Sequence, residues 1–284
     1  MLAIVVTGAW WLGRDVSPLL ETAMIRRGEL WRLVTSILPH GGILHLGFNV
    51  YWIWVFGTLL EQVLGPIKTA GLILLFAVVP NALEFAFLTG GIGLSGVGYG
   101  FFGLLWILAI HDERFRDAVD QSTVQVFVVW FFICIVATIT NVMPIANIAH
   151  GGGAVLGILT GFAIVRRDRR FPIVAGIVGI ALLAICAATI WRPVVNLSGT
   201  QGYEEGDWGY EALMAKSNQE AVRWLRDAVQ YQPRASAYWL DLGIAYERLN
   251  DKPAAIDAYR KAADLGNAAA KSHLSELYTI GSPK

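Results

Sequence analysis

Charged residues are scarce in this sequence, and they are unevenly distributed. Of the 284 residues, 15% are charged and 55% are hydrophobic, whereas soluble domains carry about 25% charged residues. Counting Asp, Glu, Lys and Arg, residues 1–191 hold 21 and residues 192–284 hold 23. This distribution indicates a membrane region followed by a soluble domain.

The sequence also lacks net charge and is poor in cysteine. The formal net charge is zero, so nothing indicates a nucleic-acid partner. The two cysteines, Cys134 and Cys186, both lie in apolar runs. We expect them to be packing residues, and they give no information about the redox compartment.

Long apolar runs define the membrane region, since a spanning helix needs about 20 predominantly apolar residues. The first run is shorter, reaching about 20 Å as a helix against a hydrocarbon core of about 30 Å. We interpret it as the remnant of a first span with upstream residues missing. The predicted spans are 1–13, 43–60, 67–88, 94–110, 122–142, 147–165 and 171–191.

Lys and Arg near the span ends predict the orientation. The loop RRDRR, 166–170, is expected to be cytoplasmic, and with it the loop 111–121 and the turn 61–68. The loop 14–42 then lies outside although it carries four arginines, which partly breaks the rule. The last span runs outward and places the soluble domain on the outer side.

The soluble part contains a helical repeat. After a linker, 192–203, residues 204–284 are expected to form a small α-solenoid in which each helix pair buries its apolar face on the next. The repeat matches the tetratricopeptide pattern, with a period of about 34 residues, at Trp239, Leu242, Gly243, Tyr246, Ala255, Tyr259 and Ala262, and one period earlier at Ala221, Leu225, Ala228 and Pro233. A generic helical hairpin is the alternative. Such a solenoid is expected to dock a protein or peptide.

The stretch GIGLSGVGYGFF, residues 91–102, places a single serine among glycines. Ser95 is either one more small residue for close helix packing or a nucleophile. Gly90, Gly91 and Gly93 before it predict a flexible entry loop.

A second glycine-rich run begins with His150 in the predicted span 147–165. Its glycines recur at four-residue steps, and so do Gly96 and Gly100 after Ser95. Two facing stripes would let the helices approach closely and bring Ser95 within hydrogen-bond reach of His150. The stripe after His150 is Gly153, Gly157 and Gly161.

Tyr99 and Glu84 are the remaining candidates for supporting His150. Tyr99 lies four residues after Ser95, on the same helix face, and is expected to pack on the imidazole of His150. Glu84 is expected to reach the outer membrane interface, which leaves no acid for a triad. The pattern therefore indicates a Ser–His dyad.

The run HGGILHLGFN contributes His40, His45 and Asn49. His45 and Asn49 are four residues apart and share a helix face. Both side chains can donate hydrogen bonds to a developing oxyanion. Zinc is disfavoured because His40 and His45 are five residues apart and no HExxH motif, cysteine or acid accompanies them. We expect no metal and no other cofactor.

These residues resemble those of the rhomboid intramembrane serine proteases. The resemblance covers roughly residues 1–191 and rests on WRLVTSILPH, the His40–His45–Asn49 run, GLSG at 93–96 and AHGGGAVLG around His150. It implies a six-helix bundle plus one extra C-terminal span. The expected fold class is therefore all-α, a polytopic membrane helix bundle followed by a small α-solenoid. The short first span and the repeat tail depart from the family pattern.

The resemblance also implies a role for each site residue. Ser95 would be the nucleophile and His150 the general base and then acid, while Asn49, His45 and the Ser95 amide would form the oxyanion hole. The supporting residues would be Tyr99, His40, Gly93, Gly96, Gly153 and Gly157, and Trp31 and Arg32 would lie in the first outer loop. The family cleaves transmembrane substrates near the outer membrane face without a metal.

The expected function is therefore that of an intramembrane serine endopeptidase. It would be a multi-pass protein of the bacterial inner or plasma membrane whose partners are the lipid bilayer, transmembrane substrates and a protein or peptide bound by the tail. One alternative is a catalytically inactive relative that binds transmembrane clients, which the presence of both Ser95 and His150 disfavours. Another is a membrane-anchored tetratricopeptide scaffold.

Overall fold

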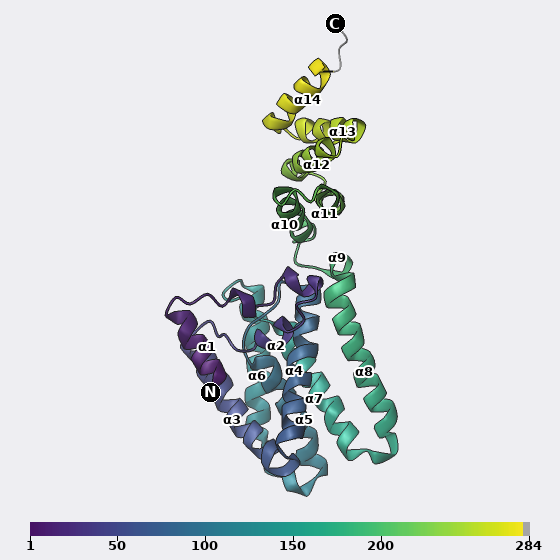
Figure 1. Ribbon diagram of the computed structural model, residues 1–284. Coiled ribbons are helices and arrows are strands. Elements are labelled where there is room, and N and C mark those ends of the chain that lie inside the picture. Colours follow the sequence, from purple (N-terminus) through teal and green to yellow (C-terminus); the bar gives the residue numbers. More distant parts are fainter. Residues whose placement is uncertain (281–284) are drawn as a thin grey trace. The chain divides into compact units, whose positions relative to one another are not determined.

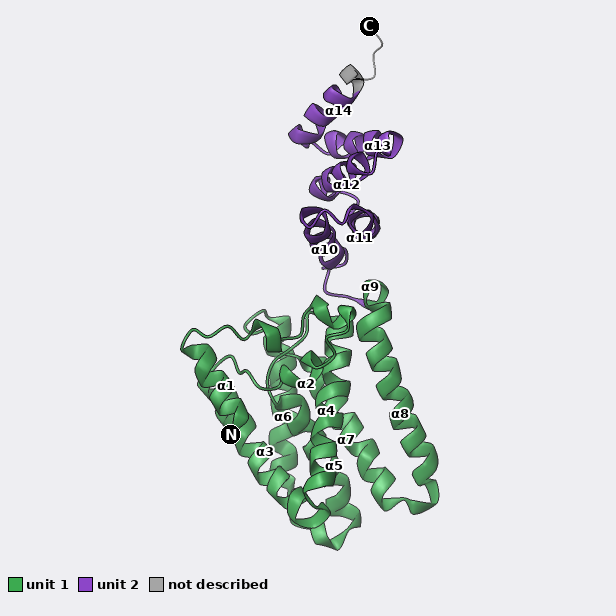
Figure 2. Cartoon of the chain, in the orientation of Figure 1, with its two compact units in different colours: residues 1–195 green, residues 196–284 purple. Residues whose placement is uncertain are grey.

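The protein is helical throughout the part that the structure describes. The computed structural model describes residues 1–280, with side chains through Leu277, and contains no strand in that range (Figure 1). The chain divides into two compact units, 1–195 and 196–284 (Figure 2). The all-α prediction is therefore confirmed. The last four residues of the predicted domain 204–284 lie outside the described residues.

The first unit is a bundle of apolar helices. Its helices are α1 (Leu2–Trp11), α2 (Arg32–Thr35), α3 (Ile43–Leu64), α4 (Pro66–Phe87), α5 (Ser95–His111), α6 (Gln121–Ile139), α7 (Asn147–Val165), α8 (Arg170–Cys186) and α9 (Arg192–Val195), with a π-helical turn, Ala187–Trp191, between the last two. Short 3₁₀ turns cover Ser17–Leu19, Ala23–Arg27, Glu113–Phe115 and Arg167–Arg169.

By length and composition, α3, α4, α6, α7 and the run Arg167–Val195 are long and apolar enough to cross a membrane. The other two predicted spans, α1 and α5, are shorter apolar helices. With 17 residues, α5 reaches about 26 Å. It is the central helix, buried along most of its length, and it packs along α7 and borders α3, α4 and α6.

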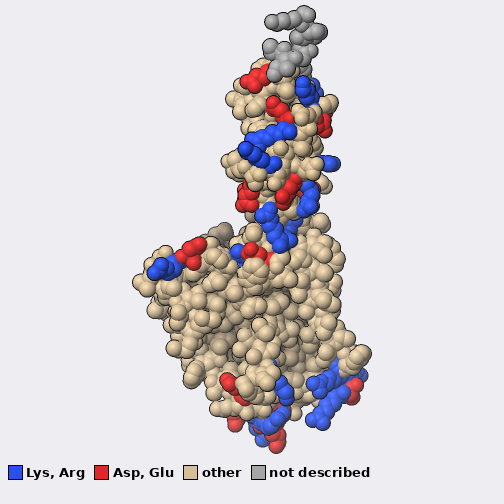
Figure 3. Space-filling view, viewed as in Figure 1, with Lys and Arg blue, Asp and Glu red and all other residues tan. Residues whose placement is uncertain are grey.

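The surface of the first unit suits a bilayer. Large apolar side chains such as Trp54 of α3 and Phe132 of α6 are exposed, and extended apolar surface of this kind marks an interaction with membrane or protein. On the face that Figure 3 shows, charged residues gather at the two ends of the unit and leave the surface between them uncharged. The predicted multi-pass membrane protein is supported.

The turn 61–68 and the loops 111–121 and 166–170 lie together at one end of the first unit, and the loop 12–42 and α9 lie at the opposite end (Figure 1). The last helix of the first unit thus ends on the side that carries the loop 12–42 (Figure 1). The structure ends the first unit at Val195. Residues 192–195 are therefore a helical extension of the last span and not part of the predicted linker 192–203.

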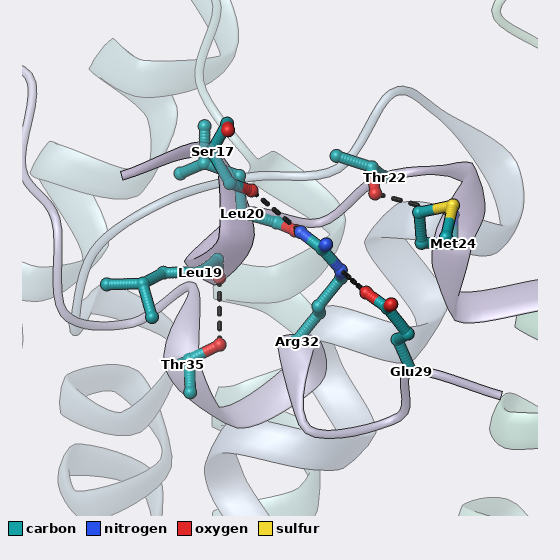
Figure 4. Close-up of polar contacts among 8 residues, drawn as sticks. All are labelled: Ser17, Leu19, Leu20, Thr22, Met24, Glu29, Arg32 and Thr35. Atoms are coloured by element: carbon teal, nitrogen blue, oxygen red, sulfur yellow. Dashed lines mark hydrogen bonds and ion pairs between the residues drawn. The ribbon is translucent and has the colours of Figure 1, made fainter. Parts of the chain in front are cut away.

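The loop 12–42 folds around the buried guanidinium of Arg32 (Figure 4). Its Nε donates to Glu29 Oε2 at 2.5 Å, and its Nη1 donates to the carbonyl oxygens of Ser17 at 2.7 Å and Leu20 at 3.0 Å. Charge-assisted bonds of this kind are stronger than neutral ones. They fix the segment 17–20 and hence the neighbouring Glu21. Trp31, by contrast, is 54% exposed.

The second unit consists of antiparallel helix pairs. Its helices are α10 (Tyr203–Met214), α11 (Asn218–Tyr231), α12 (Ser236–Arg248), α13 (Lys252–Asp264) and α14 (Ala268–Ile280). Each helix packs on the next one along the chain. In the pair α12 and α13, Gly243 lies under the ring of Tyr259, where an added Cβ would come within 2.5 Å of ring carbons.

Candidate active site

Ser95 and His150 meet where α5 and α7 begin. Ser95 is the first residue of α5 and His150 the fourth of α7. Ser95 Oγ lies 2.7 Å from His150 Nε2. Ser95 is partly exposed, whereas His150 is buried. An imidazole that accepts from the hydroxyl at Nε2 carries its proton on Nδ1, and His150 Nδ1 has no hydrogen-bond partner among the described residues. No acid therefore completes a triad in that part of the chain.

Tyr99 holds the imidazole from one side. The two rings stack with centroids 4.8 Å apart and an interplanar angle of 24°. The Tyr99 hydroxyl donates to the carbonyl oxygen of Phe127 on α6 at 3.2 Å. This bond fixes the phenol ring, and the stack in turn limits rotation of the His150 ring about its χ2 torsion.

The glycines of α7 permit the contact between the two helices. An added Cβ at Gly153 would lie 2.3 Å from the carbonyl oxygen of Gly96, and one at Gly157 would lie 2.1 Å from that of Gly100. Backbone thus meets backbone along this stripe. On α5 the arrangement differs from the symmetrical stripe predicted. A Cβ at Gly96 has ordinary contacts, and one at Gly100 would strike the Phe76 ring of α4 at 2.4 Å.

His45 and His40 lie against the segment that leads into Ser95. A Cβ at Gly93, whose φ is +99°, would be 2.7 Å from ring atoms of His45. The rings of His40 and His45 are 4.8 Å apart. The Leu94 amide donates to His40 Nε2 at 3.3 Å, and burial lowers the pKa of His40 to about 4. His40 therefore stays neutral and available as an acceptor.

Asn49 is buried on α3, one turn after His45. Its Nδ2 donates to the carbonyl oxygen of His45 at 2.9 Å. That bond uses one of the two amide hydrogens and leaves the other free for a second acceptor. The bond also fixes the side-chain rotamer relative to α3.

The loop 88–94, which precedes Ser95, is tied down along its length. The Gly91 amide donates to Glu21 Oε2 at 3.0 Å, and the Gly93 amide donates to the Ser36 carbonyl at 3.0 Å. Arg192 Nη1 donates to the Leu88 carbonyl at 2.7 Å. The glycines here serve close approach, because a Cβ at Gly90 would lie 2.6 Å from Glu21 Oε2. These contacts give the glycines a packing role, and the flexible entry loop stays a prediction.

The expectation for Glu84 is wrong. Its side chain is 2% exposed, and Oε2 accepts from the Ala149 amide of α7 at 3.0 Å. It does not reach the interface because this partner lies inside the bundle. Nearby, Asn81 Nδ2 donates to Ser36 Oγ and Ser36 Oγ donates to Glu21 Oε1. Burial raises the pKa of Glu21 to about 8.

Sequence reasoning missed the polar group formed by Glu21, Ser36, Asn81, Glu84 and Arg192. A signal existed for α4, because Asn81 and Glu84 are three residues apart on one face of a spanning helix. Polar residues inside a membrane span are candidates for a functional role. No pattern pointed to Glu21, Ser36 or Arg192, which meet α4 only through the fold.

Comparison with known proteins finds similarity over the part of the chain that holds the site. Residues 27–167 match the Rhomboid domain family. The chain is 32% identical over 137 residues to the rhomboid protease GlpG of Pectobacterium atrosepticum, which is 47% of this chain and 48% of that protein. It is 28% identical over 145 residues to the rhomboid protease GlpG of Yersinia pseudotuberculosis, covering 50% and 51% respectively.

The chain spans about half the length of these curated relatives. The matched range contains Ser95, His150 and every other predicted site residue. Glu21 and Arg192, which were not predicted, lie outside it. Both comparisons find similarity to rhomboid proteins over the same part of the chain. They therefore support the rhomboid family for the part of the chain that holds the contact between Ser95 and His150.

Proposed function

We propose that this protein is an intramembrane serine endopeptidase that cleaves transmembrane substrates with a Ser95–His150 dyad. The observation that carries the proposal is the 2.7 Å separation of Ser95 Oγ and His150 Nε2, which is the geometry required of a nucleophile and its base. The relatives are named as proteases, and the transfer of that activity to this chain is part of the proposal.

Acylation begins when His150 Nε2 takes the hydroxyl proton and Ser95 Oγ attacks the substrate carbonyl carbon. The tetrahedral intermediate collapses as the imidazolium gives its proton to the leaving amine, and an ester to Ser95 remains. Water then gives a proton to Nε2 and its oxygen attacks the ester carbon. The imidazolium returns that proton to Ser95 Oγ as the ester C–O bond breaks, which releases the carboxylic acid and the free serine. Because Nδ1 has no acid partner in the described chain, the imidazolium relies on the Tyr99 ring face for support.

The oxyanion would be held by the Ser95 amide, the free amide hydrogen of Asn49 and the ring of His45. The Ser95 amide is a first-turn donor of α5 and has no partner within its helix. The supporting geometry is the contact of the His45 ring with Gly93, two residues before Ser95. Preorganised donors of this kind contribute about 100- to 1,000-fold to the turnover rate each.

We place the site toward the outer membrane face. The basic loop 166–170 lies at the end of the unit opposite the loop 12–42, and basic loops favour the cytoplasmic side. The helix α5 spans about 26 Å, which is less than the hydrocarbon thickness of about 30 Å. Ser95 then lies below the outer interface, where a substrate helix must unwind to present its carbonyl group. The second unit follows α9 on the same outer side, in a bacterial inner or plasma membrane.

For the second unit we propose a tetratricopeptide-like solenoid that docks a protein or peptide. The close packing of Gly243 under Tyr259 and the burial of Leu242, Ala255 and Ala262 support it. They occur at the positions that such repeats reserve for small or interlocking residues.

A fluorophosphonate probe tests the proposed chemistry directly. Purified wild-type protein should be labelled and should cleave single-span substrates, and Ser95→Ala should abolish both. A folded wild-type preparation that neither labels nor cleaves any substrate of the panel would favour the inactive client-binding alternative. Labelling that persists in Ser95→Ala would exclude Ser95 as the nucleophile.

A further inference from the structure

The helix that carries His150 begins without a cap of its own. The first amides of an α-helix have no intrahelical acceptor and need a partner. The residue before α7, Ala146, offers no side-chain oxygen. Side chains that serve there are usually Ser, Thr, Asp or Asn. An α7 amide that was left unpaired inside the bundle would be costly.

Glu84 supplies the missing acceptor from another helix. Its Oε2 accepts from the amide of Ala149, the third residue of α7, at 3.0 Å. This is one of the amides that an N-cap side chain would normally satisfy. The carboxylate also lies at the positive end of the α7 dipole.

This cap lies next to the reacting groups. Ala149 directly precedes His150, whose own amide donates to the Ala146 carbonyl at 3.1 Å and closes the first turn of α7. If the first turn of α7 frayed, this hydrogen bond between His150 and Ala146 would be the first to break. The cap therefore fixes the backbone from which the imidazole extends toward Ser95.

The loop on the serine side contacts the same place. A Cβ at Gly91 would lie 2.6 Å from Cβ of Ala146 and 3.9 Å from Cγ of Glu84. The Gly91 amide is held by Glu21 Oε2. The start of α7, the Glu84 side chain and the loop leading to Ser95 are thus in mutual contact, and a shift of one displaces the others.

We propose that Glu84 is a positioning residue for the Ser95–His150 pair, which it holds in register by capping α7 from α4. This inference rests on the proposed protease function. The cap requires an acceptor oxygen, and a neutral amide provides one as well as a carboxylate does. Glu84→Gln should therefore preserve it, whereas Glu84→Leu, of similar size, removes it.

The test compares these two variants of the full-length protein with a matched control. Thr160→Val, at the other end of α7, removes a buried hydroxyl that donates to the Leu156 carbonyl at 2.7 Å. The measurements are kcat and KM for a single-span substrate, the rate of fluorophosphonate labelling, the thermal midpoint in detergent, and hydrogen–deuterium exchange of amides 148–150.

We expect Glu84→Leu to lower kcat and the labelling rate by about 10- to 100-fold, the cost of a misplacement near 1 Å, with KM changed by less than about twofold. Exchange at 148–150 should rise. Glu84→Gln should stay within about threefold of wild type. Adding Ala146→Ser to Glu84→Leu restores an acceptor at the N-cap and should recover part of the labelling rate, which also provides a readout if the single variant does not fold.

Several results would overturn the positioning role while leaving the protease function intact. These are an active wild type with an equally active Glu84→Leu, a Glu84→Gln as inactive as Glu84→Leu, or a Thr160→Val that loses as much kcat at an equal loss of thermal midpoint. A folded wild type that neither labels nor cleaves would instead refute the proposed function, and with it any role in positioning.

Discussion

Replacing Gly153 by alanine tests whether the α5–α7 contact sets the geometry of the reaction. The added Cβ would lie 2.3 Å from the carbonyl oxygen of Gly96, 3.2 Å from its carbonyl carbon and 3.3 Å from the amide nitrogen of Gly100. All three atoms belong to the backbone, so no side chain can rotate away. Restoring an ordinary contact of 3.4 Å or more requires the helices to separate by about 1 Å.

Two opposing effects decide the outcome for stability. In a helix interior, alanine is more stabilising than glycine by up to about 1 kcal/mol. Overpacking of a close contact lowers the free energy of unfolding by about 1–3 kcal/mol. We therefore expect Gly153→Ala to lower the free energy of unfolding by about 1 kcal/mol. Activity should fall much further, because Gly96 directly follows Ser95 and a misplacement of about 1 Å costs about 100-fold in rate.

The assay is the rate of fluorophosphonate labelling and of substrate cleavage, compared with the thermal midpoint. Gly152→Ala is the matched control, because its Cβ would meet only the side-chain end of Leu83 at 3.4 Å and Pro80 atoms at 3.9 Å or more. It should keep the activity of wild type. If Gly153→Ala were as active as Gly152→Ala, the contact would not set the distance between Ser95 and His150.

Two further predictions address the polar group and the second unit. Because burial raises the pKa of Glu21 to about 8 from 4.5, the folded protein holds a proton there that the unfolded chain releases, and stability falls as pH rises between those values. Glu21→Gln should therefore raise the thermal midpoint more at about pH 9 than at about pH 5, and an equal gain at both would contradict the assignment. In the second unit, Gly243→Ala would push a Cβ to within 2.5 Å of the Tyr259 ring and should cost about 1–3 kcal/mol, measured as faster hydrogen–deuterium exchange in α12 and α13, with the first unit unaffected.

The juxtaposition of Ser95 and His150 was predictable because two local patterns pointed to it. Glycines at four-residue steps indicate a helix face without side chains, and each pattern starts next to a chemically reactive residue. The identity of the interlocking atoms was not predictable. Gly100 proves to make room for Phe76 of α4, and periodicity alone cannot say which neighbour a glycine faces.

The surroundings of Glu84 show why the rest of the site escaped prediction. From the sequence, a carboxylate near the end of a span is expected to extend toward water. That expectation assumes that no backbone amide nearby needs an acceptor. The amides at the start of α7 do need one, because the residue before this helix has no capping side chain. They lie more than 60 positions later in the chain. Loop segments such as 17–20 raise the same difficulty, because their position depends on Arg32 and its backbone acceptors.

The two kinds of contact constrain different directions of motion. Backbone contacts at Gly153 and Gly157 fix the lateral distance between α5 and α7, but a smooth stripe without side chains resists sliding along the helix axes only weakly. Hydrogen bonds at the helix ends are directional and resist that sliding. In this protein they come from Glu84 to α7 and from Glu21, Ser36 and His40 to the loop before α5. A separation of 2.7 Å between Ser95 Oγ and His150 Nε2 requires both constraints, so a glycine variant and a Glu84 variant should each reduce the reaction rate. Because both act on the same separation, their combined effect should be less than the product of the two.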